Sequence, residues 1–453
     1  MSSDLARPTP DADQPPAAVS LGQASAFWLK LGLISFGGPA GQIAIMHQEL
    51  VERRRWISER RFLHALNYCM LLPGPEAQQL ASYLGWLMHR VPGGLIAGGL
   101  FVLPSLLILC LLSWIYLRFG EQVWVAAAFA GIKPAVVAIV MHACWRIGQR
   151  ALQTPIAWLL AGSAFVALIW LNLPFPLIIG AAALIGFLLR DSKLAIGAGA
   201  DHQAKRIASH LPALIDDHTP TPPHARFSAA GTARTLVVAA TLWLLPMLWL
   251  IKSWGADHAL PSMAWFFTKA ALLTFGGAYA VLPYVYQGAV EQHAWLSAAQ
   301  MIDGLALGET TPGPLIMVVS FVGFVAGHTQ AWLGPDLAWL SGILAACVVT
   351  WFTFLPSFLF IFVGAPWIES THGQLRLQAP LSAITAAIVG VILNLACFFA
   401  YHSFWPQGFG EALRYESVLI AGLALLALWR ARSVIEVIIG AGLLGCLIGW
   451  LRL

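Results

Sequence analysis

The sequence has little charge. Lys, Arg, Asp and Glu make up 10% of the 453 residues, whereas about 25% is usual for soluble proteins. Hydrophobic residues reach 59%, and the mean hydropathy is +0.75. The polar side chains are too few to cover the surface of a water-soluble globule. The composition therefore predicts a polytopic membrane protein in contact with the lipid bilayer. The net charge of +4 is spread between apolar runs and forms no basic stripe, which argues against a nucleic-acid partner.

Several chemical motifs are also missing. The sequence contains no GxxxxGK[ST], HExxH or GxSxG pattern, so it carries no Walker ATPase of its own and no recognisable hydrolase site. Its six cysteines include no CxxC pair, which argues against a zinc site or a disulfide framework. We therefore expect no enzyme activity, no catalytic residues, no bound metal and no cofactor.

Thirteen apolar segments are candidate membrane helices, since a spanning helix needs about 20 mostly apolar residues. One long polar stretch, 191–234, separates them into two groups and is expected to be a flexible cytoplasmic linker. Residues 1–22 are expected to be a disordered tail. The segments lie near 24–46, 62–88, 94–117, 122–145, 155–171, 174–190, 235–251, 263–286, 298–327, 337–363, 380–400, 416–430 and 433–451.

The two groups of segments repeat one another. Residues 27–75 align without a gap to residues 239 positions later, and 15 of the 49 positions are identical. Farther along, the offset becomes 252, so the second half carries 13 extra residues in between. The matched motifs are FGG at 36–38 and 275–277, PGP at 73–75 and 312–314, and LPS at 103–105 and 355–357.

Equivalent loops of the two halves differ in charge. Five arginines lie within 53–61, whereas the equivalent stretch 292–300 has no Lys or Arg. By the positive-inside rule the first loop faces the cytoplasm and its counterpart does not. The repeats are therefore expected to be inverted, as in many secondary transporters. The predicted units are a tail (1–22), a first repeat (23–190), a linker (191–234), a helix and loop that switch sides (235–262), and a second repeat (263–453).

The number of full spans separates two topologies. If all thirteen segments cross, the Lys and Arg residues of the two faces split 13 to 9. If the segments that carry GG and PGP are re-entrant hairpins, nine spans remain and the split is 18 to 4, which the positive-inside rule favours. Both topologies place the N-terminus in the cytoplasm and the C-terminus in the periplasm.

Glycine and proline interrupt the middle of four apolar segments, where they are expected to break the helices. Unwound backbone at membrane depth is tolerated only inside protein or around a water-filled cavity. The helices that restart after Gly38, Pro75, Gly277 and Pro314 would present free N–H groups and about half a positive charge each. The pattern predicts an anion site near the midplane; simple kinks and close packing are the alternative.

Several side chains near the breaks are candidate ligands. Lys30 and Lys269 are equivalent and precede the Gly-Gly breaks by two helical turns, which indicates anion attraction or, alternatively, snorkelling. Glu76 and Glu309 either exchange protons during transport or cap helix ends. Lys133 is expected near a helix end. Neutral groups suited to an oxyanion, or to ordinary interhelical hydrogen bonds, are Ser35, Gln78, Gln79, Thr274, Thr310 and Thr311.

The run FGGPAGQIAIMHQELVERRRWIS, followed by LLPGPEAQQLASYLG, with FGG and PGP repeated later, resembles the chromate ion transporter family in its long, two-domain form. The resemblance covers roughly 25–400 and implies a bacterial inner-membrane transporter that exports chromate, confers chromate resistance and is driven chemiosmotically. Ala278 replaces the proline of GGP, so the half-sites should differ. The family motifs fall on Gly37, Gly38, Pro39, Pro73, Gly74, Pro75, Glu76, Gln78, Gln79, Gly276, Gly277, Pro312, Gly313 and Pro314.

The sequence thus predicts an all-α polytopic secondary transporter with two inverted repeats, whose oxyanion site is built by four broken segments and assisted by Lys30 and Lys269. Sulfate or another tetrahedral oxyanion is the alternative substrate, and an anion channel is the alternative class. The oligomeric state stays open, with a homodimer as one alternative.

Overall fold

The computed structural model describes residues 16–36, 38–171, 173–189, 212–217, 219–220, 222–370, 378–406, 408 and 412–451. Over these ranges the chain is helical, apart from one isolated parallel bridge between Ile57 and Ile215. The all-α prediction is confirmed.

The helices follow the predicted segments in chain order. The first repeat comprises α1 (Leu21–Ile34), α2 (Gly38–His47), the π-helix η1 (Gln48–Arg53), α3 (Glu59–Leu71), α4 (Glu76–Phe119), α5 (Val123–Ala151), α6 (Pro155–Ile169) and α7 (Phe175–Leu188). After the short 3₁₀ helix η3 (Pro223–Ala225), α8 (Ala229–Trp254) leads to the second repeat. That repeat comprises α9 (Ala259–Leu272), α10 (Ala278–Tyr286), η4 (Gln287–Gln292), α11 (Ala298–Thr310), η5 (Leu315–Met317), α12 (Val318–Gln330), η6 (Pro335–Leu337), α13 (Ala338–Ser370), α14 (Gln378–Phe404), α15 (Tyr415–Trp429) and α16 (Val434–Leu451).

The second repeat reproduces the first down to its irregular backbone. The π-helices η1 and η4 are 239 residues apart, the offset of the sequence repeat. Two positions after the end of each π-helix, Arg55 and Ala294 both have a positive φ, at 51° and 49°. The amides of Trp56 and Trp295 then bond to equivalent carbonyls, at 2.8 and 2.7 Å. Such agreement at strained positions confirms that the halves are structural repeats.

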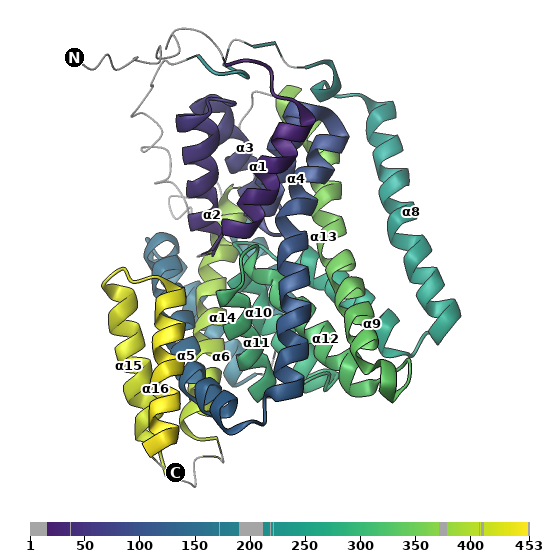
Figure 1. Cartoon of the computed structure of the whole chain (residues 1–453). Coiled ribbons are helices and arrows are strands. Elements are labelled where there is room, and N and C mark those ends of the chain that lie inside the picture. Colours follow the sequence, from purple (N-terminus) through teal and green to yellow (C-terminus); the bar gives the residue numbers. More distant parts are fainter. Residues whose placement is uncertain are drawn as a thin grey trace, which may run out of the picture.

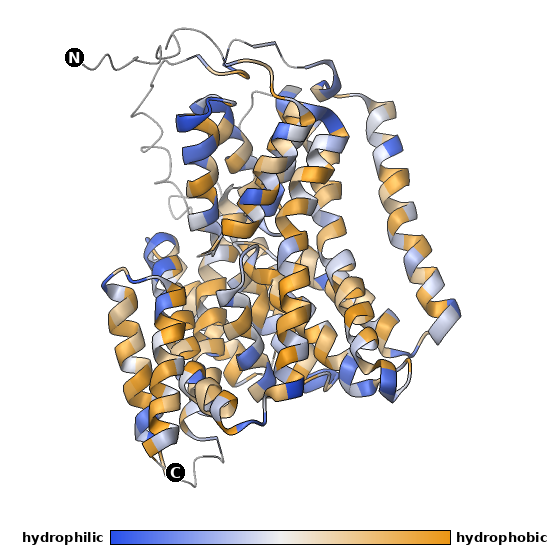
Figure 2. Cartoon of the chain, in the orientation of Figure 1, coloured by the Kyte–Doolittle hydropathy of each residue, from blue (hydrophilic) through white to orange (hydrophobic). Residues whose placement is uncertain are grey.

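The repeats are inverted. In Figure 1, α1 to α3 lie in the upper half of the molecule and α9 to α12 in the lower half, and α8 runs from one level to the other. Strongly hydrophilic residues gather at the upper and lower ends and at the upper end of α5, which lies at mid-height, and the helices are otherwise mostly apolar (Figure 2). This is the distribution expected of a protein whose middle is surrounded by hydrocarbon.

All four predicted breaks are present, and the first PGP segment folds back on itself. Non-helical backbone at His89 and Arg90 divides α4 into 76–88 and 91–119. The two parts pack side by side, since a Cβ built on Gly94 would lie 2.9 Å from the carbonyl oxygen of Ser82. The chain therefore reverses direction at the end of the segment 62–88, before the long part of α4 begins, as expected if this segment is a re-entrant hairpin.

Some expected spans are shorter than a bilayer. Six helices within the described residues are long and apolar enough to cross, namely α4, α5, α8, α13, α14 and α16. The segments predicted near 155–171, 174–190 and 416–430 form α6, α7 and α15, which have only 14 or 15 residues. A 15-residue helix rises about 22 Å, less than the roughly 30 Å hydrocarbon core.

The repeats exchange their peripheral helix pairs. Helices α6 and α7 of the first repeat pack on α14 of the second, while α15 and α16 pack on α5 of the first. Small residues allow this close approach. A Cβ on Gly131 of α5 would lie 2.8 Å from Gly445 of α16, and one on Gly390 of α14 would clash with the backbone of Ala161 in α6. The interlocked repeats share one large core.

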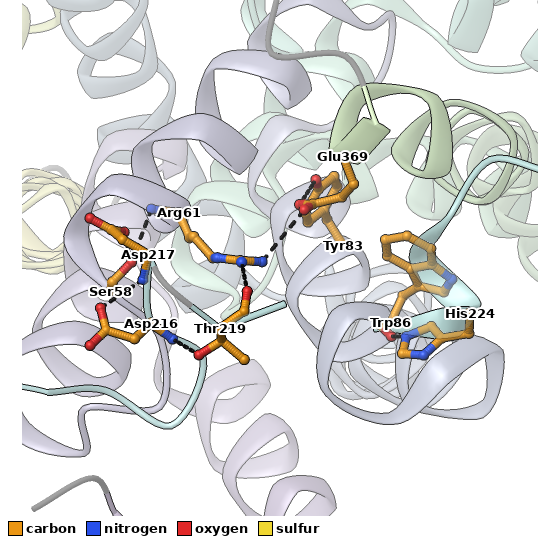
Figure 3. A network of polar contacts seen from close by, with 9 residues as sticks. All are labelled: Ser58, Arg61, Tyr83, Trp86, Asp216, Asp217, Thr219, His224 and Glu369. Atoms are coloured by element: carbon orange, nitrogen blue, oxygen red, sulfur yellow. Dashed lines mark hydrogen bonds and ion pairs between the residues drawn. The ribbon is translucent and has the colours of Figure 1, made fainter. Parts of the chain in front are cut away.

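Part of the predicted linker is packed against the protein. The amide of Ser58, the residue just before α3, donates a hydrogen bond to the carbonyl oxygen of Ile215 at 3.0 Å. The Ser58 hydroxyl donates to a carboxylate oxygen of Asp217 at 2.6 Å (Figure 3). The prediction of a flexible linker is therefore wrong for this part. The tail prediction fails similarly near residue 20, because Ser20 caps α1. Residues 1–15 of the predicted tail and residues 191–211, 218 and 221 of the predicted linker lie outside the described ranges.

The packed linker also touches both repeats through one arginine. Arg61 of α3 donates to the carbonyl oxygen of Thr219 and lies 3.6 Å from a carboxylate oxygen of Glu369 at the end of α13 (Figure 3). Tyr83 donates to the same carboxylate at 2.5 Å. The linker, the first repeat and the second repeat thus meet at the end of the molecule where the arginine-rich loop lies.

Candidate functional site

The breaks of opposite repeats meet in the interior through two equivalent hydrogen bonds. The amide of Gly74, in the first PGP turn, donates to the carbonyl oxygen of Thr274 at 2.7 Å. The amide of Gly313, in the second PGP turn, donates to the carbonyl oxygen of Ser35 at 2.8 Å. Since Ser35 and Thr274 are themselves equivalent, each PGP turn is bonded to the Gly-Gly break of the other repeat. We call this region the junction.

Glycine is required at the centre of both PGP turns. Gly74 has φ = +129° and Gly313 has φ = +108°, which other residues rarely adopt. Space is also restricted: a Cβ on Gly74 would lie 2.5 Å from the hydroxyl oxygen of Ser357, and one on Gly313 would lie 2.8 Å from Cβ of Ser105. The two serines are equivalent members of the LPS motifs on α13 and α4, so each turn also contacts a long helix of the opposite repeat.

The helices that restart after three of the breaks have no side-chain cap. Each hairpin begins with a helix capped by a side chain, from Ser20, Ser58, His258 and Ser297 respectively. The N-caps of α4, α10 and η5 are instead Pro75, Gly277 and Pro314, and the described chain supplies none of these three helices with a side-chain cap. Uncapped N-termini inside a protein are anion sites, because their N–H groups and the helix dipole both favour negative charge.

Four polar atoms at the junction lack hydrogen-bond partners within the described ranges: the hydroxyl oxygens of Ser35 and Ser357 and the side-chain carbonyl oxygens of Gln78 and Gln79. All four side chains are buried. The side-chain nitrogens of the two glutamines do have partners: that of Gln78 donates to Ser82 at 3.0 Å, and that of Gln79 donates to the Pro73 carbonyl oxygen at 2.8 Å. Buried groups of this kind call for an explanation such as a ligand.

Gln42, Ser105 and Ser357 are site residues that sequence reasoning missed. The amide nitrogen of Gln42 donates to the carbonyl oxygen of Gly313 at 2.6 Å and that of Ser35 at 3.3 Å, so it joins the two repeats. The repeated LPS motif was a signal for the serines, but their distance along the chain from the breaks concealed their role. Gln42 has Val281 as its counterpart, so no repeat signal marked it.

The predicted threonines use their hydroxyl protons within their own helices. Thr274 donates to the carbonyl oxygen of Ala270 at 2.7 Å, and Thr311 donates to that of Leu307 at 2.6 Å. Thr310 bonds in the same way, at 3.0–3.1 Å. In this structure Thr274 contributes its backbone carbonyl to the junction, and the hydroxyls are occupied.

The two predicted lysines lie on exposed helix surfaces. Lys30 borders a hollow of about 250 Å³ together with Glu49 and Arg53 of η1. The ammonium nitrogen of Lys269 lies 5.9 Å from the centre of the Trp265 ring, a cation–π contact. Neither lysine is buried, so the cost of burial gives no argument for their function.

The predicted carboxylates have different surroundings. Glu76 is half-buried in the first turn of α4, where its charge favours the helix N-terminus. Glu309 is buried in the last turn of α11 and accepts a hydrogen bond from the hydroxyl of Tyr279. Their counterparts in the other repeat are Leu315 and Met70, so the junction is asymmetric in charge.

An ion pair between a half-buried lysine and a buried aspartate connects the repeats. The ammonium of Lys133 in α5 lies 3.3 Å from a carboxylate oxygen of Asp303 in α11, and the Tyr116 hydroxyl of α4 donates to the same oxygen at 2.8 Å. The prediction that Lys133 lies near a helix end is wrong, because α5 begins ten residues earlier. The counterparts of Lys133 and Asp303 are Thr385 and His64, so no repeated pair indicated this contact.

The remaining predicted site residues line the breaks themselves. Gly38 (φ = +76°) and Pro39 open α2, and Gly276 and Gly277, with φ of +74° and +96°, precede α10. Pro312 and Pro314 are buried on either side of Gly313. Gly37 lies outside the described residues. Ala278, in place of the proline of GGP, begins α10.

Two inverted repeats, half-helices that meet between them and uncapped helix N-termini at the meeting point are features of many membrane transporters. The chain matches the family model described as "Chromate transporter" over residues 22–187 and again over 261–446, once in each repeat. The chain belongs to the chromate transporter family.

Its relatives include proteins of full and of partial length. A chromate transport protein of Pseudomonas aeruginosa is 33% identical, over 96% of this chain and 94% of that protein. A chromate transport protein of Cupriavidus metallidurans is 29% identical, over 94% of this chain and 92% of that protein. An uncharacterized transporter of Bacillus subtilis is 32% identical over 28% of this chain and 70% of its own length, and is thus much shorter. No solved structure matches the chain.

Proposed function

We propose that this protein exports chromate across the inner membrane of a bacterium and thereby confers chromate resistance, with the oxyanion bound at the junction. The observation that carries the proposal is the set of uncapped N-termini of α4, α10 and η5, brought together by the Gly74–Thr274 and Gly313–Ser35 hydrogen bonds. Backbone amides of this kind bind a dianion without the cost of burying a lysine.

The junction supplies a means of alternating access. The amides of Gly74 and Gly313 donate either to the opposite repeat, as here, or to an oxyanion that enters between the repeats. Binding of the anion therefore competes with the bonds that hold the repeats together. Rocking of one repeat against the other then opens the site to the second face, as expected for inverted-repeat carriers.

The membrane potential is sufficient to drive export. Moving a dianion out of a cell that is about 100 mV negative inside gains roughly 4.6 kcal/mol, at about 2.3 kcal/mol per charge. This supports a concentration ratio of about 10³. Uniport is therefore adequate, and Glu76 and Glu309 need not carry protons.

We assign the face that bears the arginine-rich loop to the cytoplasm. The five arginines run from the end of η1 into the first turn of α3, and Arg61 bonds to Thr219 of the packed linker (Figure 3); they are Arg53, Arg54, Arg55, Arg60 and Arg61. The start of α1 is on this side, which gives a cytoplasmic N-terminus and, at the other end of the molecule, a periplasmic C-terminus. Lys30 and Lys269, being exposed, attract the anion at the approaches to the junction and stay outside it.

The test is chromate flux into inside-out vesicles with the voltage and the pH gradient set independently. We expect chromate to accumulate when the lumen is positive, and a pH gradient without voltage to have no effect. Absence of chromate uptake under any gradient would overturn the proposal. Accumulation that follows the pH gradient alone would replace uniport by proton coupling.

Two controls define the substrate and the class of protein. Unlabelled sulfate is added as a competitor, and stronger competition by sulfate than by chromate itself would assign sulfate as the substrate. Counterflow exchange separates a carrier from a channel, because a channel gives no counterflow.

A further inference from the structure

We propose that Ser357, and by symmetry Ser105, donate hydrogen bonds from their hydroxyls to the transported oxyanion. This inference deepens the proposed function and rests on it for the position of the site. Ser357 lies on α13, far along the chain from the four breaks, and Ser105 lies on α4. Both side chains are 1% exposed.

The hydroxyl of Ser357 is aimed at the junction and is unused. Its oxygen has no hydrogen-bond partner among the described residues. It would lie 2.5 Å from a Cβ on Gly74, so it faces the same turn whose amide bonds to Thr274. The side-chain nitrogen of Gln79 would be 2.6 Å from that Cβ. The Ser357 hydroxyl and the Gln79 side-chain nitrogen therefore both lie against the Gly74 turn.

Two other buried hydroxyls on the same helices are satisfied locally. Ser113 of α4 donates to the carbonyl oxygen of Leu109 at 2.6 Å, and Thr353 of α13 donates to that of Val349 at 2.7 Å. Ser357 makes no such bond to the preceding turn; Thr350 of α13 also lacks a partner among the described residues, but only Ser357 lies against the Gly74 turn. A buried hydroxyl without a partner is unfavourable, so its persistence indicates a partner that is present only during transport.

The second PGP turn has a matching arrangement. The hydroxyl of Ser105 would lie 3.3 Å from a Cβ on Gly313, and the nearby hydroxyl of Ser35 has no partner within the described part of the chain. The side-chain amide of Gln42 completes the set by bonding to the Gly313 carbonyl. Both PGP turns therefore have neutral hydroxyl donors beside a glycine amide.

Neutral donors suit a fully deprotonated tetrahedral oxyanion. Such a dianion offers four acceptor oxygens and no hydrogen-bond donor, and hydrogen bonds to a charged group are stronger than those between neutral groups. Chromate and sulfate share this chemistry. The pair Ser357 and Ser105 would contact oxygens on opposite sides of the anion, one from each repeat.

The experiment compares Ser357→Ala and Ser105→Ala with Ser113→Ala, which removes a buried hydroxyl from α4 that already has a partner. Sulfate and chromate binding are measured as the rise in unfolding temperature of the purified full-length protein, and transport as chromate uptake into vesicles. For Ser357→Ala we expect the anion concentration that gives half the effect to rise about tenfold. Ser105→Ala should behave similarly, Ser113→Ala should match the parent protein, and Ser357→Thr should restore most of the loss.

Stability without anion separates a binding role from a structural one. Removing a hydroxyl that has no partner should not lower the unfolding temperature, because no hydrogen bond is lost. If Ser357→Ala binds sulfate and chromate as tightly as the parent protein, the inference is wrong. It is also wrong if Ser113→Ala weakens binding equally.

Failure of the proposed function gives a different result. A parent protein that is stabilised by sulfate but carries no chromate would refute chromate transport, and the loss of sulfate stabilisation in Ser357→Ala would still support the hydroxyl donor. A parent protein that neither anion stabilises and that carries neither would refute both.

Discussion

The PGP turns should not tolerate even a methyl group. Gly74→Ala places a Cβ 2.5 Å from the Ser357 hydroxyl oxygen and 2.6 Å from the Gln79 side-chain nitrogen. Overpacking of this kind costs about 1–3 kcal/mol, and φ = +129° adds about 1–3 kcal/mol for a residue with a side chain. We expect a loss of about 2–6 kcal/mol of unfolding free energy, and weaker chromate uptake because the Gly74–Thr274 bond is displaced.

The matched control is Gly99→Ala in α4, the helix that follows the turn, where a new Cβ meets no heavy atom within 4 Å. Alanine is favoured over glycine in a helix by about 0.5–1 kcal/mol, so this variant should be at least as stable as the parent protein. Both are measured by denaturant unfolding in detergent micelles and by vesicle uptake. Equal stability of the two variants would refute the assigned geometry of the turn.

Two further predictions concern contacts between elements. Lys133→Met should cost about 2–4 kcal/mol of unfolding free energy, because it leaves Asp303 buried without its cation while Lys133 itself is partly exposed; adding Asp303→Leu should recover most of the loss in a double-mutant cycle, and additive losses would contradict the pairing. Burial lowers the pKa of His224, which is only partly offset by its hydrogen bond to the Trp86 carbonyl. A lowered pKa means that the docked linker favours neutral His224, so docking should weaken as the pH falls below about 6.5; limited proteolysis of the linker should then accelerate, and His224→Gln should remove this pH dependence.

The repeats share a backbone but differ in charge. The Arg61–Glu369 contact is present at one end of the molecule, where the packed linker also lies, and the equivalents of these residues are Gln300 and Leu117. The residues equivalent to Lys133 and Asp303 are Thr385 and His64, so this ion pair is not repeated either. In the proposed alternating-access mechanism, opening toward the two faces would break different contacts, so the two access states would not need to have equal free energy.

The sequence alone determined the helical class, the two repeats and the positions of the breaks, because each depends on local properties. Apolar run length predicts membrane helices, and glycine or proline in mid-segment interrupts them wherever they fall. Loop charge predicted the inverted arrangement, since the charge of a loop is also a local property of the sequence. Segment lengths were less accurate: α6 and α7 end two residues before the predicted segments do, because apolar residues such as Leu171 and Leu189 continue into the turns that follow them.

Only the tertiary structure decided what meets at the breaks. That Gly74 bonds to Thr274, that Ser357 faces the same turn and that Lys133 pairs with Asp303 are contacts between residues about 170 to 280 positions apart. No local preference encodes them, since they arise from the packing of two inverted repeats against each other. The sequence therefore showed where the helices are broken, and the packing of the repeats showed which groups face one another there.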